Sequence, residues 1–123
     1  AVDLDDFAAI NQRYGPAEGD AVLQAVAQLL LLNLRRHDLL CRLAGDRFVA
    51  LLPNTGERQA QTIAGELEAA VASLAHRTSR HGERLHLHAT TSALMAVDEN
   101  ADELLQALNL RLAGAKQTLP RCA

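Results

Sequence analysis

The sequence contains few of the residues that mark specialised protein classes. In 123 residues it has no tryptophan, one methionine, three prolines and two cysteines, and aromatic residues make up only 2%. Two cysteines are too few for a disulfide framework, which favours a reducing compartment and predicts a cytoplasmic protein. No repeat or low-complexity tract interrupts the chain, so we expect one domain over residues 1–123.

Long apolar runs and a strong charge of one sign are also missing. The run Leu29–Leu32 is far shorter than the roughly 20 residues that span a membrane, and the N-terminus carries no signal-peptide pattern. A net charge of −3 provides no basic stripe to displace counterions, which argues against binding to nucleic acid polymers. The apolar content of 49%, mostly Leu and Ala, instead predicts a helix-rich globular domain with a real core.

Apolar periodicity and turn residues predict an alternating series of elements. We expect strands at Val2–Leu4, Leu40–Leu43, Phe48–Leu52 and Leu85–Thr91, and helices at 7–14, 20–36 and 57–74, with a last helix that Asn100 or Asp102 caps and that ends near Lys116. Residues 16–19 and 76–83 are predicted to be loops. The order β-α-α-β-β-α-β-α favours an α+β fold with a ferredoxin-like βαββαβ core, a mostly antiparallel sheet flanked by helices.

Several side chains receive a structural interpretation. Asp5 or Asp6 is expected to cap the first helix, and Cys41 is expected to behave as a small hydrophobe in its strand. Phe48–Leu52 has no polar alternation, which predicts a central strand covered on both faces. Leu31 and Leu32 widen the apolar surface of the second long helix beyond one face, which suggests a neighbouring element or a partner.

Asp3 and Asp46 form an acidic pair at the ends of strands that we expect to be neighbours. Two carboxylates brought together in this way could hold Mg²⁺, which takes oxygen ligands and substrate phosphates. Such a site serves phosphoryl transfer, in which the metal neutralises charge and aligns the attacking hydroxyl. The alternative is that Asp3, Asp5 and Asp6 are solvated acids near a helix N-terminus.

Arg35 and Asp38 form an Arg-x-x-Asp pair upstream of the predicted hairpin. An arginine can engage a guanine edge or a phosphate while the carboxylate accepts guanine N–H donors. The alternative is an ion pair at the end of a helix, where Arg35 is favourable at the C-terminal dipole. His86 and His88 share one face of a predicted strand, and a solvated face is favoured over a metal pair because no third ligand is near in the sequence.

Motifs along nearly the whole chain resemble those of the GGDEF domain family, whose members make or sense cyclic di-GMP in bacteria. The matching residues are Asp3-Leu4-Asp5-Asp6-Phe7, Asn11, Tyr14-Gly15, Gly19-Asp20, Ala44-Gly45-Asp46-Arg47-Phe48 and Ala115-Lys116. The resemblance implies a fold like that of nucleotidyl cyclases and polymerase palms. It also implies that the helix and most of the first strand with which the family begins are absent from this chain.

The resemblance assigns a role to each matching residue. Asp3 and the carbonyl of Leu4 would bind metal together with Asp46, which would also be catalytic. Asn11 and Asp20 would contact the guanine edge, and Gly45 and Lys116 would contact the rest of the nucleotide. Arg35 and Asp38 have the spacing of the family's inhibitory site, where cyclic di-GMP binds away from the hairpin.

The signature itself departs from the family pattern. Where the family reads Gly-Gly-Asp/Glu-Glu-Phe, Ala44 replaces the first glycine and Arg47 replaces the glutamate. A guanidinium beside a metal site opposes Mg²⁺ by Coulomb repulsion, and we also consider a pair between Arg47 and Asp46. Pro16 replaces a histidine common in the family, and Leu119-Pro120 follows Lys116 where the family has a second cation.

These departures favour a degenerate GGDEF domain, catalytically silent or nearly so, that binds cyclic di-GMP or GTP as a regulatory module. The alternatives are an active diguanylate cyclase that joins two GTP with Mg²⁺, and a docking or dimerisation domain that uses the leucines at 29–34 without nucleotide. Mg²⁺ is expected only if the active site works. Expected partners are an adjacent sensor or Glu-Ala-Leu-type phosphodiesterase domain, in a protein that a membrane sensor could tether, or a second copy of the chain.

Overall fold

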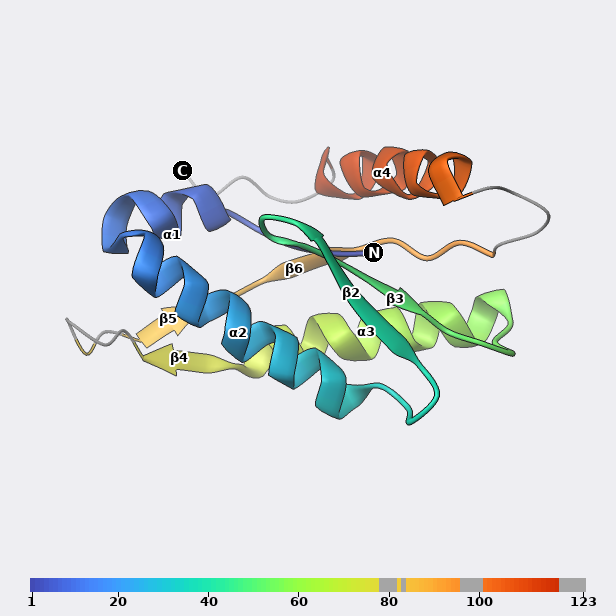
Figure 1. The fold of residues 1–123 in the computed structure, drawn as a ribbon, viewed down its shortest axis with the longest axis horizontal. Helices are drawn as coiled ribbons and strands as arrows, with labels where there is room; N and C mark the ends of the chain where they lie inside the picture. Colours follow the sequence, from blue (N-terminus) through green and yellow to red (C-terminus); the bar gives the residue numbers. More distant parts are fainter. Residues whose placement is uncertain (78–81, 83, 96–100, 118–123) are drawn as a thin grey trace.

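The sheet at the centre of the molecule has four antiparallel strands in the order β2-β3-β1-β6 (Figure 1). A computed structural model describes residues 1–77, 82, 84–95 and 101–117. The strands are β1 (Val2–Leu4), β2 (Leu39–Ala44), β3 (Arg47–Leu51) and β6 (Ala89–Thr91). With α2 between β1 and β2 and α3 between β3 and β6, this is the predicted ferredoxin-like core, and the α+β fold class is confirmed.

Helices cover both faces of this sheet. They are α1 (Phe7–Tyr14), α2 (Pro16–Asn33), α3 (Glu57–Ser73) and α4 (Ala101–Gln117). The main core lies between the sheet and the helices α2 and α3, and its fully buried side chains include Leu4, Val26, Leu30 and Phe48. Helix α4 lies on the opposite side of the sheet from α2 in Figure 1, against β6. None of the helices within the described residues is long and apolar enough to cross a membrane.

The alternation of side chains along β1 determines which face each metal-site candidate occupies. Val2 and Leu4 are buried at 2% and 1% exposure among the residues of the main core. Asp3 therefore points to the other face, over which α4 lies. This strand positions the acidic cluster, because the backbone leaves β1 directly after Leu4 and enters α1 at Phe7.

The predicted loop at residues 16–19 is wrong. Helix α2 already begins at Pro16, separated from α1 only by Gly15. Proline is well suited to the first position of a helix because its missing N–H has no partner there in any case. The helix also ends at Asn33 rather than Arg36, because Leu34 is extended and the N–H of Arg35 turns to the Asp38 side chain.

The region after α3 also differs from the prediction. The expected loop at 76–83 begins as strand β4 (Ala75–Arg77), which pairs with β5 (Arg84–His86) in a separate two-stranded sheet. The expected single strand Leu85–Thr91 is therefore split into β5 and β6 around the buried Leu87. The halves pair with different strands, which periodicity along one segment cannot reveal.

Three smaller expectations are corrected as well. Asp6 occupies the N-cap position of α1 but makes no capping bond with its side chain, while Asp5 accepts a hydrogen bond from Thr90 at 2.8 Å. Cys41 is exposed, because the face of β2 on which it lies carries no helix cover. Only the beginning of Phe48–Leu52 is covered on both faces as predicted. Phe48 and Val49 are buried, whereas Leu51 is 47% exposed. Asn100, one of the expected caps of α4, lies outside the described residues.

Candidate functional site

The signature hairpin connects β2 to β3 beside the end of β1. Ala44 pairs with Arg47 across the turn, and Gly45 has φ +52°, a left-handed conformation that favours glycine. The N–H of Leu4 donates to the carbonyl of Asp46 at 3.2 Å. The structure therefore brings the backbone of Asp46 next to Asp3 and Leu4, as the proposed metal site requires.

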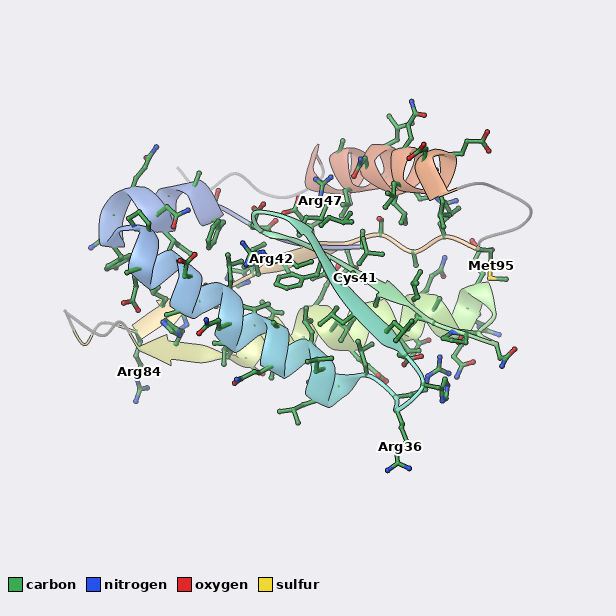
Figure 2. All side chains as sticks on the ribbon, in the orientation of Figure 1. Arg36, Cys41, Arg42, Arg47, Arg84 and Met95 are labelled. Atoms are coloured by element: carbon green, nitrogen blue, oxygen red, sulfur yellow. The ribbon has the colours of Figure 1, made fainter. Side chains whose placement is uncertain are left out.

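Arg47 places its guanidinium on the carboxylate of Asp3. Arg47 Nη2 lies 3.0 Å from Asp3 Oδ2, and Arg47 Nη1 donates to Asn109 Oδ1 on α4. Asp3 is 5% exposed and is the cross-strand partner of Arg47 in the β1–β3 register. Arg47 points from the hairpin toward α4 (Figure 2). Asn109 was not among the predicted residues, because nothing in the sequence links it to the hairpin.

The fit of Mg²⁺ to this corner is poor. The oxygen donors that Mg²⁺ prefers are present, namely the Asp3 carboxylate and the backbone around Leu4 and Asp46. However, the Arg47 guanidinium is already bound to Asp3, and its fixed positive charge opposes a second cation. Among the described residues, no cluster of three or more His, Cys, Asp or Glu side chains could hold a metal ion.

The predicted guanine-contacting residues lie on α1 and α2. Asn11 lies on α1 against Gly19 of α2, and a Cβ built at Gly19 would overlap Asn11 Oδ1 and come within 3.3 Å of Phe7 Cζ. The missing side chain at Gly19 thus lets Asn11 and Phe7 approach the second helix. Asp20 is exposed next to Gly19, so its carboxylate is accessible. Lys116 belongs to α4, and its side chain lies outside the described part of the structure.

Arg35 and Asp38 form a compact cluster in the turn between α2 and β2. The Arg35 side chain donates from Nε to Asp38 Oδ2 at 3.0 Å and from Nη2 to Asp38 Oδ1 at 2.9 Å. The backbone N–H of Arg35 donates to the same carboxylate at 2.8 Å. Arg35 Nη2 also donates to Thr55 Oγ1 at 2.5 Å. Thr55 was not predicted, although the Pro53-Asn54-Thr55-Gly56 turn before α3 was a visible signal.

Burial and charge fix the protonation states in this cluster. The Asp38 side chain is fully buried, whereas the Arg35 side chain is 31% exposed. The hydrogen bond from Arg35 lowers the pKa of Asp38 below its ordinary value, against the opposing effect of burial. The same bond raises the pKa of Arg35. Asp38 is therefore an ionised anchor, and Arg35 presents the accessible part of the pair.

The hairpin and the Arg35 cluster lie at opposite ends of the β2–β3 ribbon. Ala44 and Arg47 form the turn end, whereas Leu39 and Leu51, which are cross-strand partners, mark the other end. Asp38 directly precedes Leu39. A ligand at one end therefore need not touch the other.

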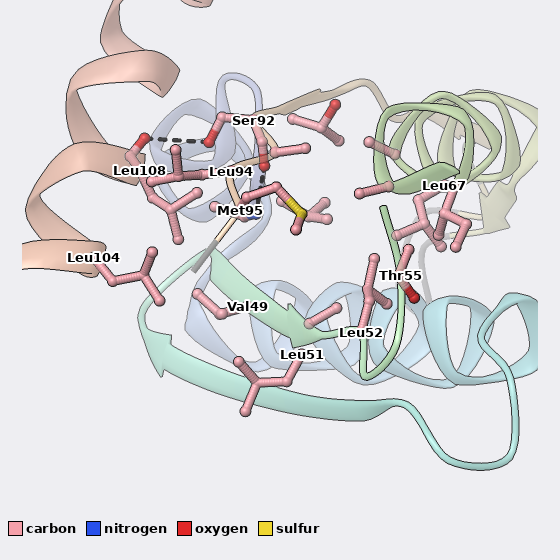
Figure 3. Close-up of a pocket in the computed structure, with 18 of the residues that line it drawn as sticks. Val49, Leu51, Leu52, Thr55, Leu67, Ser92, Leu94, Met95, Leu104 and Leu108 are labelled. Carbon is pink, nitrogen blue, oxygen red and sulfur yellow. Dashed lines mark hydrogen bonds between the residues drawn. The ribbon is translucent and has the colours of Figure 1, made fainter. Parts of the chain in front are cut away.

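A pocket of about 760 Å³ opens near the Leu51 end of β3, between α3, α4 and the segment that follows β6 (Figure 3). Its walls are mostly apolar, and its polar lining includes Thr55 and Ser92. The N-terminus of Ala1 donates to the carbonyl of Ser92 at 2.7 Å at its edge. None of the predicted catalytic, metal or nucleotide residues lines this pocket, but Thr55, which accepts a hydrogen bond from Arg35, does.

The histidines have structural surroundings. His86 and His88 are exposed, as expected for a solvated face. His76 lies in β4 rather than in a loop, and its Nε2 is 2.9 Å from Glu18 Oε1 in a largely buried pair. This contact ties β4 to the first turn of α2.

Comparison with known proteins identifies the family. The family model for the GGDEF domain of diguanylate cyclases matches residues 1–120. The chain is 34% identical over 108 residues to the probable diguanylate cyclase DgcE of Escherichia coli (strain K12), covering 88% of this chain and 10% of that protein. It is 38% identical over 84 residues to the bifunctional diguanylate cyclase/cyclic di-GMP phosphodiesterase MucR of Pseudomonas aeruginosa, covering 68% of this chain and 12% of that protein.

Solved structures agree with the sequence relatives. The diguanylate cyclase SiaD of Pseudomonas aeruginosa, solved in complex with its activator SiaC, superposes with a TM-score of 0.87 at 28% identity. That match covers 95% of this chain and 45% of SiaD. The chain thus spans about a tenth of the curated relatives it matches and about half of this structural neighbour. The chain belongs to the GGDEF domain family of diguanylate cyclases, which acts in cyclic di-GMP signalling.

Proposed function

We propose that this GGDEF domain is a regulatory module that binds cyclic di-GMP through Arg35 and makes little or none of it. The observation that carries the proposal is the anchored guanidinium of Arg35, held by the buried Asp38 carboxylate and by Thr55 while 31% of its side chain stays exposed. An arginine fixed in this way loses little conformational freedom when it binds a ligand.

The chemistry of cyclic di-GMP suits this position. Its guanines present O6 and N7 acceptors and its phosphates present oxygens, and arginine N–H groups can donate to either. The bonds to Asp38 and Thr55 use Nε and Nη2 of Arg35, which leaves Nη1 to donate to the ligand. Arg35 already donates hydrogen bonds to both oxygens of the buried Asp38 carboxylate. We therefore assign Asp38 the role of positioning Arg35, in place of direct contact with guanine. The exposed Arg58 adds positive charge near the same end of the ribbon, which favours an anionic ligand.

The signature hairpin supports the second half of the proposal. Family members that synthesise cyclic di-GMP have an acid where this chain has Arg47, and Arg47 is bound to the carboxylate assigned to metal. Ala44 adds a Cβ where the family brings backbone close to phosphate. Both changes act against binding of metal-loaded GTP.

Titration calorimetry with cyclic di-GMP tests the Arg35 site. We expect saturable binding by the unmodified domain and at least tenfold weaker binding by Arg35→Ala, since a tenfold change corresponds to about 1.4 kcal/mol. Arg36→Ala is the matched control, because Arg36 projects away from the molecule at the same turn (Figure 2). Absence of binding by the unmodified domain would overturn the proposal, and so would equal affinities of the Arg35 and Arg36 variants.

We further propose that the domain passes its signal to a neighbouring domain of a longer chain. The bifunctional relative MucR joins cyclase and phosphodiesterase activities in one protein, which supports an adjacent phosphodiesterase or sensor domain as the partner. The cytoplasmic location expected from the cysteine content stays a prediction.

An active diguanylate cyclase is the second candidate. The bond from Leu4 to Asp46 favours it, because this bond keeps the catalytic candidate beside β1. In this case Asn11, Asp20, Gly45 and Lys116 would bind GTP. We would then expect conversion of GTP to cyclic di-GMP with Mg²⁺, abolished by Asp46→Asn and measured by chromatography of the products. No product at high protein concentration would dismiss this candidate.

A nucleotide-independent docking domain is the third candidate. Leu31 and Leu32 on α2 are 55% and 82% exposed, which favours a partner surface on this helix. Self-association or domain docking without any nucleotide binding would identify this function.

A further inference from the structure

The position of Arg47 is fixed by the backbone of the sheet. Asp3 and Arg47 are cross-strand partners of β1 and β3, so their side chains leave the same face at neighbouring positions. Their ion pair at 3.0 Å follows from this register and does not depend on a long reach across the surface. Asp3 is 5% exposed, which limits access of water to its carboxylate.

The second terminal nitrogen of the Arg47 guanidinium also makes a hydrogen bond. Arg47 Nη1 donates to the side-chain oxygen of Asn109 on α4, while Nη2 donates to Asp3 on β1. A carboxylate and an amide oxygen around one positive centre are donors of the kind that also surround a hard divalent cation. Here the positive centre belongs to the chain, and it joins the central sheet to α4.

A guanidinium differs from a bound metal in one decisive respect. It remains charged at all physiological pH values and cannot dissociate from the protein. A divalent cation that approached Asp3 would meet this fixed charge at short range, where a largely buried site has little screening. Mg²⁺ and Arg47 therefore compete for the same carboxylate, and Arg47 is always present.

We propose that Arg47 is a built-in cation that takes the place of Mg²⁺ at Asp3, so that the hairpin, β1 and α4 are held together without metal. The inference rests on the proposed function for the assignment of Asp3 as the metal ligand. Its consequence is that the charge at position 47 decides whether this corner binds a divalent cation.

Titration with Mn²⁺ alone tests this inference, with free Mn²⁺ followed by electron paramagnetic resonance. We expect no saturable binding by the unmodified domain in the millimolar range. We expect Arg47→Glu to bind Mn²⁺ saturably, at concentrations at least tenfold below the highest one at which the unmodified domain shows no saturation. Arg42→Glu is the matched control, because it makes the same change in net charge at an exposed position of β2. Addition of Asp3→Asn to Arg47→Glu is expected to abolish the gain.

A second variant covers the case in which Arg47→Glu is poorly folded. Arg47→Gln removes the charge but keeps a polar side chain, and we expect Mn²⁺ to raise its melting temperature and that of Arg47→Glu, but not that of the unmodified domain. Saturable Mn²⁺ binding by the unmodified domain that Asp3→Asn removes would overturn the inference. Equal responses of Arg47→Glu and Arg42→Glu, or no response of either position 47 variant, would also overturn it.

These measurements contain no nucleotide and leave Arg35 intact at the other end of the β2–β3 ribbon. Failure of cyclic di-GMP to bind would therefore overturn the proposed function and leave the Mn²⁺ result unchanged. Conversely, Mn²⁺ binding at Asp3 of the unmodified domain would refute the built-in cation without affecting the Arg35 site.

Discussion

Arg35 and Arg47 show how one residue type acquires different roles from its neighbours. Each side chain is 31% exposed and is paired with a buried carboxylate. In each pair the carboxylate is the buried partner, so removing the arginine would leave a buried charge without compensation. Arg47 is held by Asp3 and Asn109 on β1 and α4, whereas Arg35 is held by Asp38 and Thr55 in the turns before β2 and after β3, where it is suited to a ligand.

Gly19 provides a prediction at the same scale. We expect Gly19→Ala to destabilise the domain by about 1–3 kcal/mol, because the new Cβ overlaps the side-chain amide of Asn11, which must move, and crowds the Phe7 ring. Alanine's better helix propensity offsets about 1 kcal/mol of this loss. Gly65→Ala on α3 is the control, since nothing lies within 4 Å of a Cβ there, and we expect it to stabilise by about 0.5–1 kcal/mol. Urea unfolding midpoints measure both changes, and equal midpoints would contradict the steric argument.

At the scale of elements, the parts of the fold with strong local signals were predictable. Helix α3 was expected at 57–74 and is observed at Glu57–Ser73, because its apolar positions repeat on one face and Pro53 to Gly56 mark its start. The hairpin of β2 and β3 was expected from apolar runs on either side of a glycine turn. The family motifs also predict the acidic cluster at the end of β1 and the pair of Arg35 and Asp38.

The elements that were missed depend on partners distant in the sequence. Strand β4 has only three residues, and its hydrogen bonds come from β5 and its anchor from Glu18 on α2. The sequence pattern predicts a loop at Pro16, although proline is also well suited to the start of a helix. In the site, Thr55 and Asn109 were missed because each reaches its arginine over 20 and 62 positions of sequence, respectively.

At the scale of the whole molecule, the β2–β3 ribbon separates two candidate sites that lie close together in the sequence. One end carries the Arg35 cluster, and the other carries the hairpin that α4 reaches through Asn109. A change in the position of α4 would therefore move the Arg47 guanidinium and alter its ion pair with Asp3. The apolar pocket lies near the Leu51 end of the ribbon, where its lining includes Thr55 as well as Ala1 and Ser92.

The amino group of Ala1 gives a pH prediction for a chain that begins at this residue. Burial, together with the charge of Arg47, lowers the pKa of this amine from 8.0 to about 6 in the folded protein. Between these values the unfolded chain binds more protons than the folded one, so the free energy of unfolding rises as pH increases from about 6 to 8. Below pH 6 both states are protonated, and the folded state bears the full penalty of about 3 kcal/mol.

Acetylation of the Ala1 amine isolates this effect. The acetylated amide keeps an N–H for the Ser92 carbonyl but no longer titrates, so we expect the acetylated chain to be more stable at pH 5.5 and the difference to vanish by pH 8.5. Every other titratable group is common to both proteins and cancels in the comparison. Urea unfolding at both pH values measures the difference, and parallel pH profiles would show that the ammonium ion does not bear this penalty. A longer chain resembles the acetylated one, because a peptide bond before Ala1 replaces the ammonium ion. Its charge is then absent from the edge of the apolar pocket.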